Sequence, residues 1–168
     1  MRDALPHLGP PGVALDLASG AGPDARFLAD RGWKVLALDL SIEGLRRMRA
    51  ADRPGRNPWP VLGDAATFRT RPAAFDLVVN HRFLLRESFA LIRESLRPGG
   101  LLLFETFSVI ELEELGAGIH PAFTLRRGEL LEAFVGWEIL LHEEGVFERE
   151  EGERGLARLI ARKPPLAR

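Results

Sequence analysis

Along most of this chain, short apolar runs alternate with segments that have helical periodicity. Parallel strands need a long crossover connection, usually a helix, so this alternation is typical of a parallel sheet covered by helices. The chain is therefore predicted to adopt an α/β fold with a doubly wound, mostly parallel sheet and helices on both faces. The expected parallel strands are Val13–Leu17, Lys34–Leu40, Pro60–Leu62, Phe75–Asn80 and Leu101–Phe107.

Helix signals fill the gaps between these strands. The first helix is expected from about Pro23 to Arg31, because proline is tolerated in an opening turn and Gly32 is suited to end the helix. Ser41 is a good N-cap for a second helix. A third helix is expected to stop at the sequence LRPGG. The apolar faces comprise Ile42, Leu45 and Met48 in the second helix and Leu85, Phe89, Ile92 and Leu96 in the third.

The C-terminal third of the chain has a different pattern. Residues 108–126 are irregular and contain GAGIHPAF, which predicts a loop, interpreted as a lid over the substrate. A short helix is expected over Gly128–Phe134. The sequences WEILLHEEGVFE and GLARLIARK then predict an antiparallel hairpin at one edge, which gives a seven-stranded sheet.

Composition narrows the class of protein. A length of 168 residues fits one domain, residues 1–168, with a short leader at 1–11. The net charge of −1 disfavours a broad nucleic-acid-binding surface, and the absence of cysteine excludes zinc-thiolate sites and a cysteine nucleophile. We expect no metal, and a cytoplasmic location because neither a signal peptide nor a membrane span is evident. Scarce asparagine and glutamine suit a thermophile, or reflect GC-rich coding.

The loop after the first strand, within VALDLASGAGPDARFLADRG, indicates a nucleotide-like ligand. Gly20, Gly22 and Ala25 satisfy the dinucleotide pattern G-x-G-x-x-G/A, so an NAD-binding oxidoreductase is one interpretation. Asp16, however, ends an otherwise apolar strand, where a carboxylate is costly unless something compensates it. The Asp16 carboxylate would repel a pyrophosphate and attract an ammonium or sulfonium group. The structural alternative is that Asp16 is a strand-end carboxylate whose charge is compensated by hydrogen bonds within the protein.

The sequence resembles the class I S-adenosylmethionine-dependent methyltransferases. Their first motif is an acid followed by small residues, here DLASGAG, with Ala18 in place of the first glycine. VLALDLS, LGDA, FDLVVN and LRPGGLLLFE follow in the family's order. The resemblance implies a Rossmann-like fold and S-adenosyl-L-methionine as cofactor. It implies cofactor contacts from Asp16, Ala18, Ser19, Gly20, Gly22, Asp39, Leu40, Asp64, Ala65 and Asn80.

The resemblance also assigns these contacts. Asp39 is expected to accept hydrogen bonds from the ribose hydroxyls, and Asp64 and Ala65 to lie near the adenine. Asn80 and His81 are expected beside the methionine part and the transferred methyl. The structural alternative is that Asp39 and Asp64 are acidic residues that occupy turns and contact no ligand.

HPAFTLRRGELLEAFVGWEILLHEEG looks like the C-terminal part of tellurite-resistance and thiopurine methyltransferase-like proteins. A small-molecule methyl acceptor is therefore expected as partner, and a soft chalcogen anion would need no base. For an oxygen or nitrogen acceptor, the candidate catalytic residues are His81, Arg82 and His120, each with a surface role as alternative. NHRF stands where DNA amino-methylating enzymes have DPPY or NPPY, which disfavours a nucleic-acid base. Two further possibilities stay open: that the protein forms a homodimer, and that it binds the cofactor without catalysing a reaction.

Overall fold

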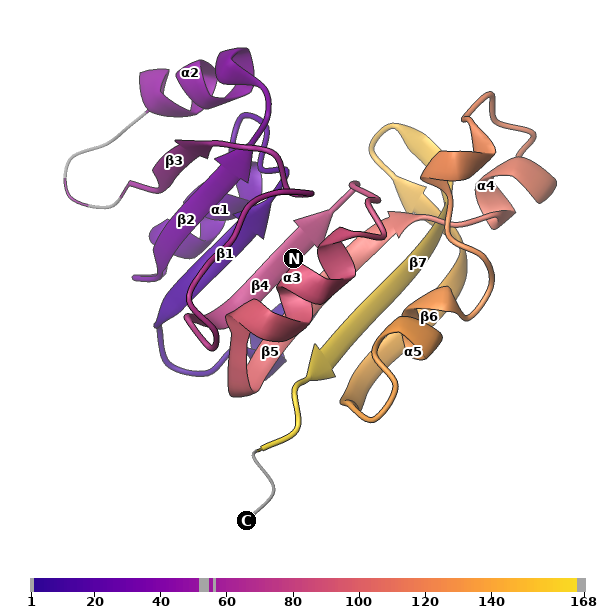
Figure 1. The fold of residues 1–168 in the computed structure, drawn as a ribbon. Helices are drawn as coiled ribbons and strands as arrows, with labels where there is room; N and C mark the ends of the chain where they lie inside the picture. The colour runs from indigo at the N-terminus through magenta and orange to yellow at the C-terminus, as the bar shows by residue number, and fades with distance from the viewer. Residues whose placement is uncertain (1, 52–54, 56, 166–168) are drawn as a thin grey trace.

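The fold is a seven-stranded sheet in the order β3-β2-β1-β4-β5-β7-β6, seen in a computed structural model that describes residues 2–51, 55 and 57–165 (Figure 1). The first five strands in sequence are parallel, and β7 runs antiparallel to β5 and to β6. This confirms the predicted fold class. The strands are β1 Val13–Leu17, β2 Lys34–Asp39, β3 Trp59–Leu62, β4 Phe75–His81, β5 Leu96–Phe107, β6 Glu138–Arg149 and β7 Gly152–Arg162.

The strand order reverses at β1. Chain connections run from β1 outward to β2 and β3, and then return to β4 on the other side of β1. Loops leaving β1 and β4 therefore diverge at the carboxyl ends of the strands, which is where open α/β sheets bind ligands. Leu17 is paired with Leu38 on one side and with Asn80 on the other, so the ends of β1, β2 and β4 are level.

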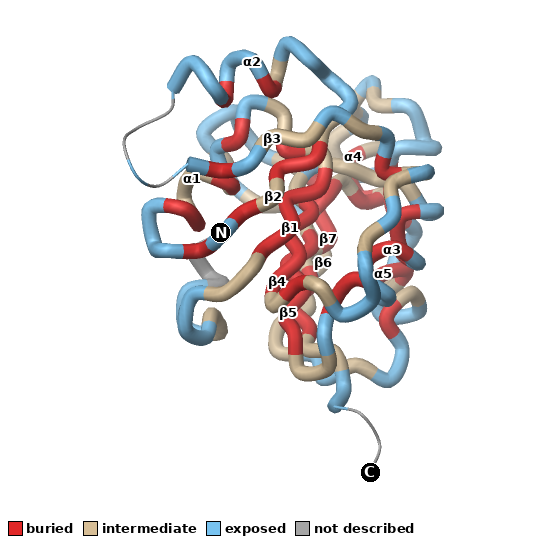
Figure 2. Tube along the Cα trace, turned by 60° about the vertical axis from the view of Figure 1, so that its left-hand side comes forward, coloured by how far each residue is buried: buried red, intermediate tan, exposed pale blue. Residues whose placement is uncertain are grey.

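Helices cover both faces of the sheet, and the strands between them are largely buried (Figure 2). Leu28 of α1 and Met48 of α2 belong to one apolar cluster, while Ile92 of α3 and Phe134 beside α5 belong to the other. The helices are α1 Pro23–Ala29, α2 Ile42–Ala50, α3 Ser88–Ser95, α4 Ile110–Glu113 and α5 Glu129–Ala133, with 3-10 turns at Arg2–His7 and Pro121–Phe123. Among the described residues, no helix is long and apolar enough to cross a bilayer.

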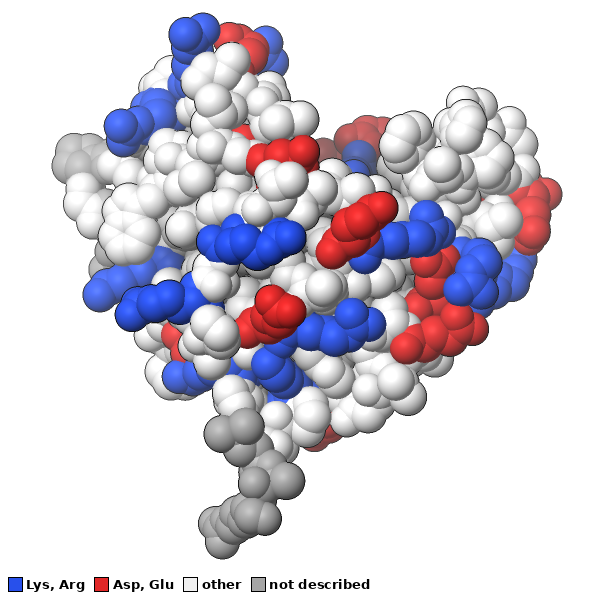
Figure 3. All heavy atoms as spheres, in the orientation of Figure 1, with Lys and Arg blue, Asp and Glu red and all other residues white. Residues whose placement is uncertain are grey.

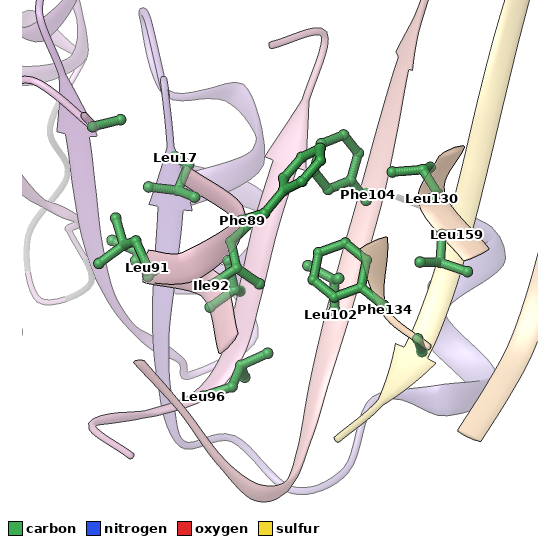
Figure 4. Packing of buried hydrophobic residues seen from close by; sticks show 14 of the residues in the cluster. Leu17, Phe89, Leu91, Ile92, Leu96, Leu102, Phe104, Leu130, Phe134 and Leu159 are labelled. Carbon is green, nitrogen blue, oxygen red and sulfur yellow. The ribbon is translucent and has the colours of Figure 1, made fainter. Parts of the chain in front are cut away.

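An aromatic cluster ties α3 and α5 to the sheet (Figure 4). The Phe134 ring lies 5.7 Å from that of Phe89, 6.4 Å from that of Phe104 and 5.1 Å from that of Trp137, measured between centroids. Phe89 and Phe104 meet edge to face at 5.8 Å. These tilted arrangements are the favoured ones for aromatic pairs. The cluster holds the C-terminal half of the chain against β5.

Two predicted boundaries are wrong. The third helix spans only Ser88–Ser95, because Leu96 is extended and begins β5, which was expected to start at Leu101. Leu96 pairs with Phe75, and Gly99 and Gly100 exchange backbone hydrogen bonds of 2.9 Å with Lys163. Hydrogen bonds to neighbouring strands thus make LRPGG part of the sheet.

The second helix begins after Ser41, whose hydroxyl accepts a hydrogen bond from the Gly44 N–H at 3.1 Å, as expected of an N-cap. Its residues Leu45 and Met48 are buried, whereas Ile42 in the first turn is exposed. The expected lid, residues 108–126, is more regular than predicted: it contains α4 and the turn Pro121–Phe123, and Ser108 bridges to Leu125.

Candidate functional site

A tight loop follows β1 at the switch point. Ala18, Gly20 and Gly22 all have left-handed backbones, with φ of 54°, 54° and 74°. At Gly22 a Cβ atom would lie 2.6 Å from the Met48 Cε, so a side chain there would displace Met48 as well as strain the backbone. Ala18 replaces the glycine of the family motif in a conformation that costs an L-residue about 1–2 kcal/mol. The loop is therefore kept in a strained form that brings its backbone close to α2.

Asp39, the last residue of β2, fastens this loop. Its Oδ2 accepts a hydrogen bond from the Gly20 N–H at 2.6 Å, and its Oδ1 accepts one from the Ser41 N–H, also at 2.6 Å. A carboxylate has about four acceptor positions, so each oxygen can accept another bond from a ligand. The ribose contact of Asp39 stays a prediction that this geometry permits.

Three buried polar atoms near the ends of β1 and β4 have no hydrogen-bond partner. Among the described residues, the buried side-chain atoms that lack a hydrogen bond include Asp16 Oδ2, Ser19 Oγ and Asn80 Oδ1. Asp16 and Asn80 are only 2% and 1% exposed. Each such atom costs roughly 1–3 kcal/mol, and native proteins contain few of them. Their concentration at the ends of β1 and β4 indicates that a polar ligand completes the site.

A hollow of about 330 Å³ is lined by two of these residues, Asp16 and Ser19, and by His81, which follows Asn80. Figure 3 shows the molecule notched at this end, between the part that carries α2 and the part that carries α4. The hollow thus offers space for a ligand at the place where buried polar atoms need one. It is lined by Asp16, Ala18, Ser19, Pro23, Asp24, His81, Arg82 and Glu151.

The electrostatics of Asp16 favour a cationic ligand. Burial raises the pKa of this carboxyl well above its ordinary value, and the negative charge of Asp24 raises it further. The Ala25 N–H and the charge of His81 lower the pKa only in part. A positive group in the hollow would stabilise the carboxylate and relieve this penalty. An ammonium group therefore fits the site, and a pyrophosphate does not.

His81 lies between two carboxylates. Its Nδ1 is 2.8 Å from Asp24 Oδ2, and its Nε2 is 3.1 Å from Glu105 Oε1. The hydrogen bond to Asp24, followed by that to Glu105, raises the pKa of His81 to about 9. At neutral pH the ring is therefore an imidazolium with both nitrogens engaged. The candidate role of a general base does not suit this environment.

Charged residues continue across four neighbouring strands from His81. Glu105 pairs in register with His81 on β4 and with Arg158 on β7, and Arg158 pairs with Glu143 on β6. Arg158 Nε lies 3.0 Å and Arg149 Nη2 3.1 Å from Glu105 Oε2. Burial would raise the pKa of Glu105, but these cations and the His81 hydrogen bond outweigh it and lower the pKa to about 2.

The other two catalytic candidates have different positions. Arg82 follows β4 with a left-handed backbone, φ 55°, and its Nη1 lies 2.7 Å from Glu151 Oε2. His120 is exposed on the lid, where its Nδ1 accepts a hydrogen bond from the Ala122 N–H at 3.2 Å. It is not among the residues that line the hollow. The structure thus brings Arg82, but not His120, together with the cofactor candidates.

The expected adenine contacts lie at the ends of β2 and β3. Asp64 Oδ1 accepts a hydrogen bond from the Ala66 N–H at 2.9 Å, which forms a turn, and Ala65 is buried. Leu40 and Leu62 are 71% and 57% exposed beside this turn. Exposed apolar side chains at a strand end suit an aromatic ring as neighbour. The adenine assignment stays a prediction.

Asp24, Glu105 and Arg158 were missed by the sequence reasoning. Glu105 interrupts LLLFETF and Arg158 interrupts GLARLIARK. A charge inside an apolar strand is the same signal that identified Asp16, so it could have indicated both residues. Asp24 carried only the weak signal of an acid in the first turn of a helix.

Comparison with known proteins identifies the family. A model of the methyltransferase domain family matches residues 14–100, which is about half of the chain and includes the loop, Asp39 and Asn80. The chain belongs to this methyltransferase family. It is a class I S-adenosylmethionine-dependent methyltransferase domain, with S-adenosyl-L-methionine as the cofactor.

A curated relative, the malonyl-[acyl-carrier protein] O-methyltransferase of Enterobacter lignolyticus (strain SCF1), is 35% identical over 109 residues. The match covers 60% of this chain and 41% of the relative, so it spans less than half of that protein's length.

Two solved structures share the fold. A methyltransferase from Methanosarcina mazei has a TM-score of 0.78 at 19% identity, covering 98% of both chains. TehB from Haemophilus influenzae has a TM-score of 0.80 at 23% identity, covering 96% of this chain and 60% of that one.

Replacing Asp39 with alanine is expected to weaken the binding of S-adenosylhomocysteine by about tenfold, because charge-assisted hydrogen bonds to the ribose are lost and the Gly20 N–H is released. Isothermal titration calorimetry measures the affinity, and circular dichroism checks that the variant folds. Glu43→Ala, which removes only an exposed i,i+4 ion pair with Arg47, is the control. Unchanged affinity of the folded Asp39→Ala variant would count against the ribose assignment.

Proposed function

We propose that this methyltransferase domain transfers a methyl group from S-adenosyl-L-methionine to a small-molecule acceptor. The observation that carries the proposal is the pair of unpartnered buried atoms Asp16 Oδ2 and Ser19 Oγ, whose residues line a hollow at the switch point. The amino-acid end of the cofactor supplies the cation that this site lacks. The residues that would hold the cofactor are those of the β1 loop, Asp39, Asn80 and the turn at Asp64.

The charge of His81 bears on the choice of acceptor. With both ring nitrogens engaged by carboxylates, this residue is not available to deprotonate an alcohol or an amine. We therefore infer an acceptor that arrives with its nucleophilic electron pair already exposed. A soft chalcogen anion of the tellurite or thiopurine kind meets this requirement, and so does a carboxylate.

A carboxylate is the second candidate, favoured by the curated relatives, whose names specify O-methylation of a malonyl group on an acyl-carrier protein. Holding the acceptor in line with the methyl group then supplies most of the rate, since proximity can be worth about 7–11 kcal/mol. The NAD-binding alternative has less support, because a pyrophosphate would meet the Asp16 carboxylate. A single domain over residues 1–168, a cytoplasmic location, a homodimer and heat adaptation stay predictions from the sequence.

The test is methyl transfer from labelled S-adenosyl-L-methionine to a panel of tellurite, thiols, carboxylates, phenols and amines. We expect transfer to at least one anionic acceptor and little to the amines. With a carboxylate acceptor and saturating S-adenosyl-L-methionine, the rate should not rise between pH 6.5 and 9, because His81 titrates only near the upper end. A rate that increases through this range would indicate a general base. No transfer to any acceptor, with S-adenosylhomocysteine still bound, would favour a cofactor-binding protein without catalysis.

A further inference from the structure

A second hollow adjoins the cofactor hollow and shares Arg82 with it. It measures about 250 Å³, and its lining is mostly apolar. Two of its residues, Ile119 and Phe123, come from the segment expected to form a lid, and Phe123 is 58% exposed. The full lining is Arg82, Phe83, Leu84, Thr106, Phe107, Ile119 and Phe123.

Arg82 is placed at the junction by its backbone. A non-glycine residue in the left-handed region is costly, and such strain is concentrated at functional sites. The Arg82 N–H donates to the carbonyl oxygen of Glu105 at 2.7 Å, which fixes the turn immediately after β4. Arg82 therefore lines both hollows, and its Nη1 lies 2.7 Å from Glu151 Oε2.

The partner of Arg82 is easily exchanged. Glu151 lies in the two-residue turn between β6 and β7, and its side chain is 56% exposed. An ion pair of this kind is typically worth only about 0.2–1 kcal/mol. The neighbouring Glu105, by contrast, is engaged by His81, Arg149 and Arg158. Arg82 can thus release Glu151 and bind another anion without breaking the charged row across the sheet.

We propose that the second hollow binds the methyl acceptor as an apolar body with a single carboxylate, and that Arg82 exchanges Glu151 for this carboxylate. The inference rests on the proposed function and specifies its substrate class. Asp16 and Arg82 both line the cofactor hollow and carry opposite charges, so the cationic end of the donor is attracted to one and the anionic end of the acceptor to the other.

The transfer needs no proton. An oxygen of the acceptor carboxylate forms a bond to the methyl carbon, while the bond from that carbon to sulfur breaks and its electron pair stays on sulfur. The negative charge of the acceptor and the positive charge of the sulfonium cancel, which leaves a methyl ester and a thioether. The neutral ester no longer neutralises Arg82, so Glu151 can pair with it again and the product is released.

Three probes with the same eight-carbon chain test the proposal: octanoate, 1-octanol and octylamine. Each is titrated into the full chain saturated with S-adenosylhomocysteine. We expect octanoate to bind about tenfold or more tightly than either of the others, because only it forms a charge-assisted hydrogen bond with Arg82. Arg82→Gln should abolish this preference. Glu151→Gln should tighten octanoate binding several-fold, because the competing carboxylate is removed.

Arg47→Gln is the matched control, since it removes an equally charged side chain whose partner Glu43 lies on the outer surface of α2. It should leave the octanoate affinity unchanged. Equal affinity for octanoate and 1-octanol would overturn the proposal, and so would unchanged or weaker octanoate binding by Glu151→Gln. The two proposals fail separately: absent S-adenosylhomocysteine binding contradicts the proposed function, whereas intact binding without an octanoate preference contradicts only the acceptor class.

Discussion

Replacing Asp16 with asparagine is expected to weaken S-adenosylhomocysteine binding by about 100-fold, because a charged hydrogen bond to the amino group is worth roughly 1.5–3 kcal/mol and Asp16 is only 2% exposed. The wild-type affinity should also rise with pH, since the pKa of Asp16 is raised in the free protein and the ligand cation requires the carboxylate. Calorimetry in buffers with different ionisation enthalpies should then detect proton release on binding by the wild type, and less by the variant.

The same substitution should stabilise the ligand-free fold. A carboxyl whose pKa is higher in the folded than in the unfolded state binds its proton more tightly when folded. The wild type therefore loses stability as the pH rises from the unfolded value, near 3.8, through the raised folded value. Asparagine has no such titration, so the difference in melting temperature should grow with pH over this window. Melting curves that remain parallel at all pH values would contradict an energetic penalty at Asp16.

Replacing Phe134 with alanine is expected to destabilise the fold by about 3–5 kcal/mol, the usual cost of truncating a buried phenylalanine. Phe134 is 1% exposed, and its ring contacts those of Phe89 and Phe104 (Figure 4) and also that of Trp137. Its loss would leave a cavity and detach α5 from β5. Chemical denaturation monitored by circular dichroism measures the effect.

Phe123→Ala is the matched control, because the same atoms are removed from a ring that is 58% exposed on the lid. Its effect should be within about 1 kcal/mol. If Phe134→Ala were no more destabilising than this control, the aromatic cluster would not be part of the core.

The parallel strands could be predicted because each signal is local. Val13–Leu17 has the bounds expected from its apolar run and the small-residue loop that follows, and Ser41 caps α2 through its own hydroxyl. β5 was placed less well, since its first residues are extended only through pairing with Phe75 and Lys163. Partners that are distant in sequence decide such boundaries, and a local pattern does not contain them.

In the candidate site, too, the features that depend on local sequence could be predicted, and those that depend on distant partners could not. Asp16 could be identified because a carboxylate in an apolar strand requires compensation, whatever its neighbours are. The state of His81 could not be predicted, because it depends on Asp24 from α1 and on the register that sets Glu105 beside it. The second hollow also depends on tertiary structure, since the segment after β4, the end of β5 and the lid each contribute part of its lining.

The central claim is that the Asp16 carboxylate receives the positively charged amino group of the cofactor. A crystal structure of the protein with S-adenosylhomocysteine tests it most directly. We expect the amino nitrogen within hydrogen-bonding distance of Asp16 Oδ2, with the ribose hydroxyls at Asp39. A complex in which Asp16 Oδ2 has no ligand partner, or in which an anionic group occupies the hollow beside it, would contradict this assignment of the site.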